Sequence, residues 1–161
     1  MTISETLIID GKFLAKSVNL KTKNKLDLIY KEKQSKIKLK IITVGDDTIT
    51  KIYVENKIII AREIGIDAEI IQCPDYITNK KLIEIIRGFN NDKEINAIII
   101  QLPLPVHLNK ELIFSSIDIK KDVDGFHPNN IGKLYAGYNT SLVPCTANAC
   151  LHAIKSVKSN L

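Results

Sequence analysis

The chain has 161 residues, of which 45% are hydrophobic and 25% are charged, so we expect one globular domain rather than a disordered chain. The net charge of +5 comes almost entirely from lysine, because Arg62 and Arg87 are the only arginines. Lysines scattered among glutamates and isoleucines indicate a solvated basic surface. They argue against a nucleic-acid partner, since nucleic-acid readers gather arginines and aromatics on one face.

The cysteines, the amino terminus and the apolar runs together predict a cytoplasmic protein. Cys73, Cys145 and Cys150 form no metal-binding spacing, and an odd cysteine count in a lysine-rich chain fits a reducing compartment with thiols in the core. Residues 1–5 carry no basic segment of a secretory signal. No stretch approaches the ~20 apolar residues of a membrane span, so we expect no membrane partner.

The hydrophobic periodicity predicts an α/β protein. In chain order we expect a helix over 11–33, a strand over 37–44, a helix over 48–64, a strand over 66–73, a helix over 78–90 and a strand over 95–102. The last strand is a continuous apolar run in which apolar and polar residues do not alternate. Such a run is typical of a strand that is covered on both faces, as in the middle of a parallel sheet. Strands alternating with helices favour a three-layer βαβ sandwich with a mainly parallel sheet.

The remaining segment combines short helices with a loop that carries polar groups. We expect helices over 108–117 and 146–158 and a functional loop over 118–130. In open α/β sheets ligands bind beyond the carboxyl ends of the strands. Asp46 and Asp47 follow the first strand and Gln101 follows the third, so these three residues are candidates for a site.

The helix over 48–64 separates its charges into two faces. At about 100° per residue, Lys51, Glu55 and Arg62 share one arc, whereas Thr50, Tyr53 and Lys57 share another. Two interpretations of Lys57 stay open. Its amine extends from a half-buried flank into water, or it is desolvated beside apolar walls and exchanges protons near neutral pH. The Tyr53 ring offers a face to a flat heterocycle, and ordinary packing is the alternative.

The run Asp122-Val123-Asp124-Gly125 also has two interpretations. It lacks the third oxygen ligand and the distal glutamate of a calcium loop, so we expect no metal. It forms a glycine turn with bonds to its own backbone, or one carboxylate accepts paired N–H bonds from a heterocycle such as a pterin. Cys145 is expected in the core or at a helix cap, and no glycine-rich phosphate loop occurs.

Several segments resemble, in order and spacing, the bifunctional methylenetetrahydrofolate dehydrogenase/methenyltetrahydrofolate cyclohydrolase family (FolD-type). The matching segments are residues 8–12 (IIDGK), 44–47 (VGDD), 53–57 (YVENK), 101–105 (QLPLP), 121–128 (KDVDGFHP), 130–132 (NIG) and 144–146 (PCT). The resemblance extends over essentially the whole chain and corresponds to the amino-terminal catalytic domain of the family. It implies domain bounds of 1–143, with residues 144–161 as a helix leading to a dinucleotide-binding domain.

The resemblance implies a role for individual residues. Lys57 is the expected catalytic lysine that assists attack of water on the methenyl bridge, and Gln101 hydrogen-bonds it and helps to set its protonation state. Tyr53 is expected to stack on the folate, and Asp124 to hold the pterin edge. The other implied substrate-binding residues are Thr50, which keeps a hydroxyl where the family commonly has serine, Pro103 and Leu104.

The resemblance also implies chemistry that this chain lacks. The family oxidises 5,10-methylenetetrahydrofolate with NADP and then hydrolyses the methenyl product, and its members are usually homodimers. We expect the NADP domain to be absent here, so that cyclohydrolase activity or folate binding remains at best. Ala147 and Ala149 replace a proline and a glycine of the family, and strain is expected if that glycine needs a positive φ. The alternatives are an inactive, degenerate folate-binding remnant and an unrelated α/β interaction module.

Overall fold

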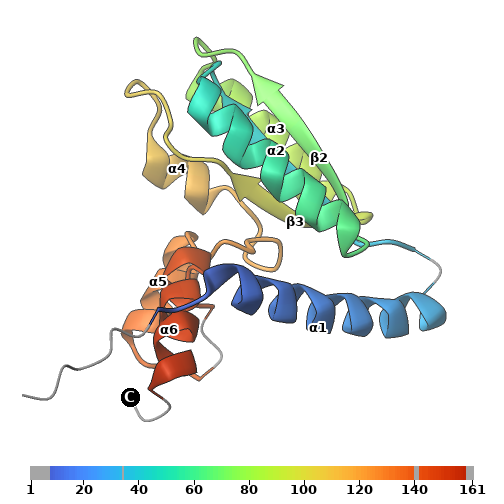
Figure 1. Cartoon of the computed structure of the whole chain (residues 1–161). Coiled ribbons are helices and arrows are strands. Elements are labelled where there is room, and N and C mark those ends of the chain that lie inside the picture. Colours follow the sequence, from blue (N-terminus) through green and yellow to red (C-terminus); the bar gives the residue numbers. More distant parts are fainter. Residues whose placement is uncertain (1–7, 34, 140–141, 159–161) are drawn as a thin grey trace, which may run out of the picture.

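The computed structural model describes residues 8–33, 35–139 and 142–158 of the chain. In this part, strands and helices alternate up to Ile100, and three further helices follow (Figure 1). The strands are β1 (Lys38–Val44), β2 (Asp67–Cys73) and β3 (Ile95–Ile100). The helices are α1 (Gly11–Glu32), α2 (Thr48–Glu63), α3 (Asn79–Asn91), α4 (Lys110–Ser115), α5 (Pro128–Tyr135) and α6 (Cys145–Val157).

The three strands form a parallel sheet in the order β2-β1-β3. Parallel neighbours need a crossover connection, which α2 and α3 provide, and the expected α/β fold with a parallel sheet is confirmed. The placement of the third strand in the middle of the sheet was wrong. β3 lies beyond β1 and forms an isolated bridge from Ile98 to Asp122 on its outer side. Burial on both faces does not determine which strands flank a strand.

Helices cover both faces of the sheet and make a three-layer structure (Figure 1). On one face α2 packs Val54, Ile58 and Ala61 against the sheet. On the other face α3 and α4 contribute a larger core, in which Leu82, Ile86 and Ile113 are fully buried. Burial of each such side chain stabilises the fold by roughly 1.5–3 kcal/mol relative to exposure.

Helix α1 lies outside these layers. Its carboxyl-terminal half is anchored by buried Leu26 and by Tyr30, whose hydroxyl donates to the carbonyl of Gly65 and accepts from the amide of Ile37, both at 3.1 Å. Its amino-terminal half runs beside α6 (Figure 1). Phe13 is 68% exposed, so part of the apolar stripe of α1 is not covered by the described residues.

The expected element bounds agree with the structure to within two residues at either end. Helix α5 was not expected, because its first residues were assigned to the loop over 118–130. His127 caps this helix through its ring, which accepts from the amide of Asn129 at 3.1 Å, and histidine is not among the usual start signals. Gly132 inside the helix further weakened its sequence pattern.

The expected domains, 1–143 and 144–161, include residues 1–7, 140–141 and 159–161, which lie outside the described residues. None of the helices in the described part of the chain is long and apolar enough to cross a membrane.

Candidate active site

The candidate site lies where β1 and β3 end. Because the two strands are parallel, their carboxyl ends share one edge of the sheet. Gln101 follows β3 directly, and its backbone N–H donates to the carbonyl of Ile42 at 2.8 Å, which fixes the residue against β1. Asp46 and Asp47 follow β1 in the exposed turn before α2. The sheet thus brings the ends of two strands to one edge, as the sequence predicted, but it does not gather the three candidates in one site, because Asp47 lines a different cavity from Gln101 and Asp46 lines neither of these two.

Lys57 and Gln101 form the central polar contact of the site. The Lys57 ammonium donates to Gln101 Oε1 at 2.9 Å, and Gln101 Nε2 donates to the carbonyl of Leu102 at 2.7 Å. The second bond orients the amide so that its oxygen faces the lysine. Lys57 Nζ also lies 5.3 Å from the centroid of the Tyr53 ring, within cation–π range. The ion pairs found among the described residues do not include this half-buried lysine.

A cavity of about 480 Å³ opens beside this contact, within the range of small-molecule sites. Residues of α2, the end of β3, the loop before α5 and the start of α6 line it. They are Tyr53, Lys57, Ile100, Gln101, Leu102, Asp124, Phe126, Cys145, Thr146 and Ala149. Four of the predicted site residues, Tyr53, Lys57, Gln101 and Asp124, therefore share one cavity.

The two carboxylates of the loop before α5 have separate positions. Asp122 is buried and accepts from the amide of Gly125 at 3.0 Å, which is the glycine turn of the first interpretation. Asp124 instead lines the cavity, as the second interpretation requires of one carboxylate. Gly125 has φ +78°, a conformation that glycine adopts without the steric cost of a side chain.

Cys145 does not lie in the core, and of the two expected places, core or helix cap, it is found next to the cap residue Pro144. It is the exposed first residue of α6, and its Sγ lies 3.5 Å from the carbonyl of Val123. Partial desolvation raises the pKa of the Cys145 thiol, and the charge of Asp124 raises it further. Cys150 is also exposed, because none of the residues of α6 is buried. Cys73 is buried at the end of β2, as expected of a core thiol.

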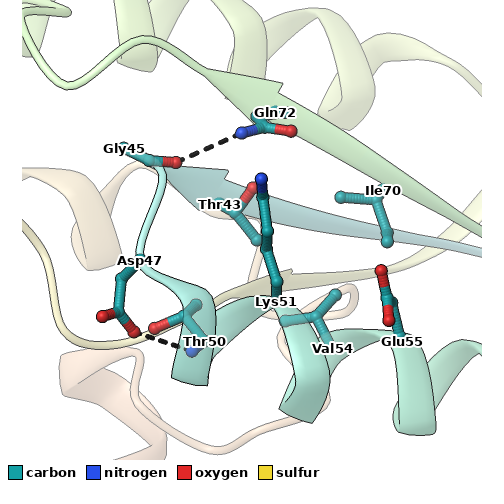
Figure 2. A pocket seen from close by; sticks show the side chains of 9 residues that line it. All are labelled: Thr43, Gly45, Asp47, Thr50, Lys51, Val54, Glu55, Ile70 and Gln72. Carbon is teal, nitrogen blue, oxygen red and sulfur yellow. Dashed lines mark hydrogen bonds between the residues drawn. The ribbon is translucent and has the colours of Figure 1, made fainter.

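The other three predicted substrate-binding residues do not line this cavity. Thr50 lines a separate cavity of about 160 Å³ between α2 and the β1–β2 side of the sheet (Figure 2). Its backbone N–H donates to the Asp47 carboxylate at 2.7 Å. Pro103 is exposed, and Leu104 packs in the larger hydrophobic core. The roles expected of these residues stay predictions.

Sequence reasoning did not place α6 at the site. Cys145 and Ala149 are spaced by four residues and so share a helix face, which lines the cavity together with Thr146. That spacing was a usable signal, but nothing local indicated that this face meets the end of β3. The strain considered for Ala149 is not found. Within the described residues the positive φ angles belong to glycines, and α6 is helical throughout.

The described residues offer no metal site, and the turn before α2 does not suit NADP. In residues 8–33, 35–139 and 142–158 no group of three or more His, Cys, Asp or Glu side chains is placed to hold a metal ion. A dinucleotide pyrophosphate binds at a helix amino terminus after a strand. At the start of α2 that place holds Asp46 and Asp47, whose pKa values are lowered by Lys51 and by the amide of Thr50, respectively. Two carboxylates repel a pyrophosphate, so this turn does not fit NADP.

The fold and the cavity define an α/β domain with a lysine-lined cavity at the carboxyl edge of its parallel sheet. Residues 9–124 match the family described as "Tetrahydrofolate dehydrogenase/cyclohydrolase, catalytic domain", and the chain belongs to this family. It is 43% identical over 156 residues to a bifunctional protein FolD of Wolbachia sp. subsp. Brugia malayi, covering 97% of this chain and 53% of that protein. The FolD protein of Orientia tsutsugamushi (strain Ikeda) is 44% identical over 156 residues, which cover 97% of this chain and 52% of that protein.

Solved structures agree with this assignment. The bifunctional enzyme FolD of Campylobacter jejuni superposes with a TM-score of 0.88 at 35% identity, covering 93% of this chain and 53% of that one. The Trypanosoma brucei enzyme, solved with NADP cofactor and inhibitor, gives a TM-score of 0.90 at 27% identity, with 96% and 52% covered. The chain thus spans about half the length of the relatives it matches. Family membership excludes an unrelated interaction module.

Proposed function

We propose that this chain binds a reduced folate and hydrolyses 5,10-methenyltetrahydrofolate to 10-formyltetrahydrofolate. The contact between Lys57 and Gln101 carries the proposal, since it holds a lysine that has no carboxylate partner in the described part of the chain against a cavity of small-molecule size. The family match supports the choice of folate as the ligand. A reduced folate is the proposed partner, with no nucleic-acid or membrane partner, and the proposed location is the cytoplasm.

In the proposed reaction water attacks the carbon that bridges N5 and N10 of the folate. Lys57, in its neutral form, accepts a proton from the attacking water, and a tetrahedral carbinolamine forms. The bond from this carbon to N5 then breaks, N5 takes up one proton, and the hydroxyl becomes the formyl carbonyl on N10. One proton is released to solvent overall. Gln101 holds Lys57 in place for the proton transfer.

The other cavity residues have binding roles in this proposal. Tyr53 presents its ring to the folate, and it is 58% exposed, so its face is accessible. Asp124 accepts N–H bonds from the edge of the pterin, which a carboxylate does well because it has two acceptor oxygens. The domain bounds 1–143 and 144–161 belong to the same proposal. In this proposal the oxidation of 5,10-methylenetetrahydrofolate belongs to the full-length protein. NADP then binds at a place other than the β1–α2 turn.

The test is hydrolysis of 5,10-methenyltetrahydrofolate by the full chain, followed through loss of the methenyl absorbance and corrected for the buffer rate. We expect acceleration by the unmodified chain and none by Lys57→Ala. Lys51→Ala is the matched control, because Lys51 lies on the other face of α2 and pairs with Asp46, so its loss should leave the rate unchanged. Tight folate binding without hydrolysis would identify the inactive remnant. Absence of folate binding by a folded sample would refute the proposal.

A further inference from the structure

Asp122 is a buried carboxylate that accepts three hydrogen bonds and lies outside the proposed catalytic contacts. It is 5% exposed. Its Oδ1 accepts from the amide of Gly125 at 3.0 Å, and its Oδ2 accepts from the amide of His127 at 2.9 Å and from Asn130 Nδ2 at 2.7 Å. These three donors come from the loop before α5 and from α5 itself. The carboxylate therefore closes the loop over residues 122–127 into one fixed turn, which we call the Asp122 turn.

The Asp122 turn is attached to the strand that ends at Gln101. The backbone of Asp122 bridges Ile98 of β3, and the Ile98 amide donates to the carbonyl of Lys121 at 2.8 Å. The Lys121 ammonium also donates to carbonyls at the end of α3. The start of the turn is therefore attached both to β3 and to α3. Gln101 follows β3 directly, and Asp124 lies in a turn that is hydrogen-bonded to β3. Both residues are therefore positioned relative to the same strand.

The same turn contacts the segment that leads into α6. A Cβ added at Gly125 would lie 3.3 Å from the backbone nitrogen of Pro144 and 3.4 Å from the carbonyl oxygen of Leu142, so the two backbones are close. The thiol of Cys145 approaches the carbonyl of Val123. Because Cys145 and Thr146 line the cavity, a shift of the turn displaces two of its walls together.

We propose that Asp122 is a positioning residue for folate binding, which holds the Asp122 turn so that Asp124 and the start of α6 face the Lys57–Gln101 contact. This inference rests on the proposed function for its ligand. Asp122 itself has its oxygens occupied by the protein and does not line the cavity. It therefore acts through Asp124 and affects substrate binding more than the chemical step.

The substitution Asp122→Asn tests this role with little change in volume. Each oxygen of Asp122 accepts from at least one N–H donor. In the variant side chain an NH2 group replaces one of these oxygens, so whichever way the amide is turned, its NH2 group faces an N–H donor. The double variant Asp122→Asn/Asn130→Asp restores an acceptor opposite that nitrogen and is the rescue. Asp118→Asn is the matched control, because Asp118 is an exposed carboxylate of the same loop whose one side-chain hydrogen bond among the described residues comes from the nearby amide of Lys120.

Two kinds of readout separate positioning from stability. The first is hydrogen exchange at the amides of Gly125 and His127, and the second is KM against kcat for 5,10-methenyltetrahydrofolate with the full chain. We expect Asp122→Asn to speed exchange at both amides and to raise KM about tenfold or more, with a smaller change in kcat. The double variant should recover part of both effects, and Asp118→Asn should change neither.

Unchanged exchange at Gly125 and His127 in folded Asp122→Asn would overturn the proposal, whether or not the chain binds folate. Faster exchange with an unchanged KM would also overturn it, since the turn would then have no effect on binding. If Asp122→Asn does not fold, Asn130→Ala removes one donor and keeps the carboxylate. A raised KM in that variant supports the proposal, and an unchanged KM contradicts it. Failure of the unmodified chain to bind folate is the separate sign that the proposed function is wrong.

Discussion

The Lys57 ammonium and the Gln101 side-chain oxygen are 2.9 Å apart, although 44 positions separate the two residues in the sequence. Lys57 lies on the middle of α2 and Gln101 follows the last residue of β3, so the contact forms only when the helix packs on the sheet. The amide of Gln101 is held from its other end by the carbonyl of Leu102. Gln101 therefore supplies a neutral, fixed acceptor to the lysine.

Replacement of that acceptor by a charge should slow hydrolysis. Gln101→Glu sets a carboxylate against Lys57, which stabilises the ammonium over the neutral amine that accepts the proton from water, so kcat should fall. Gln101→Met removes the acceptor without adding charge and should lower kcat/KM by about tenfold or more, since a bond to a charged group contributes about 1.5–3 kcal/mol. Hydrolysis rates over a range of substrate concentrations give both kcat and kcat/KM, and an unchanged kcat in Gln101→Glu would contradict the first expectation.

The ring of Tyr53 is expected to contribute to folate affinity and not to folding. Tyr53→Ala removes both the stacking face and the cation–π contact with Lys57, and we expect about five- to tenfold weaker folate binding. Tyr53→Phe keeps the ring and should bind normally. The control is Tyr135→Ala, because Tyr135 is 95% exposed on α5 and is not a cavity residue. Fluorescence or calorimetric titration gives the affinities, and equal affinity of Tyr53→Ala and the unmodified chain would refute the stacking role.

Gly125 and Gly137 form a matched pair for testing the close approach of the Asp122 turn to Pro144. Both have positive φ, +78° and +73°, so alanine at either costs roughly 1–2 kcal/mol in backbone strain. Of these two glycines, only Gly125 has described atoms within 4 Å of the place that an added Cβ would take. Gly125→Ala should therefore lose roughly 1–3 kcal/mol more than Gly137→Ala in the free energy of unfolding by urea. Equal losses would mean that the segment before α6 moves aside without cost.

The cap of α2 should make stability depend on acid. The amide of Thr50 lowers the pKa of Asp47, so the stabilisation by this carboxylate is present above its ordinary pKa and is lost as the pH falls through the lower value in the folded state. Asp47→Ala should lower the urea midpoint at pH 7, and the difference from the unmodified chain should shrink below about pH 4. Thr78 caps α3 with a neutral hydroxyl, so the effect of Thr78→Ala should not vary with pH. A constant difference for Asp47→Ala would contradict the assignment.

Local sequence patterns determined most of the secondary structure and the helix face of Lys57. The apolar period of 3.6 in α3 and the unbroken apolar run of β3 are local signals, since each element must bury one stripe or both faces. The spacing of Tyr53 and Lys57 likewise placed them on one face of α2, and the structure brings that face to the cavity. Helix α5 was missed although Pro128 at its start is a usable signal, because its cap is a histidine and Gly132 interrupts its pattern.

The tertiary structure alone decided which groups meet. It joined Lys57 to Gln101, separated Asp122 from Asp124 by burying one and leaving the other at the cavity, and brought α6 to the same wall. It also set Thr50 at a second cavity and Leu104 in the core, although both had been grouped with the substrate-binding residues. The physical reason is the distance along the sequence over which each kind of interaction acts. Periodicity and capping act within one or two turns, whereas the register of a parallel sheet and the packing of its helices fix contacts between residues far apart in the chain.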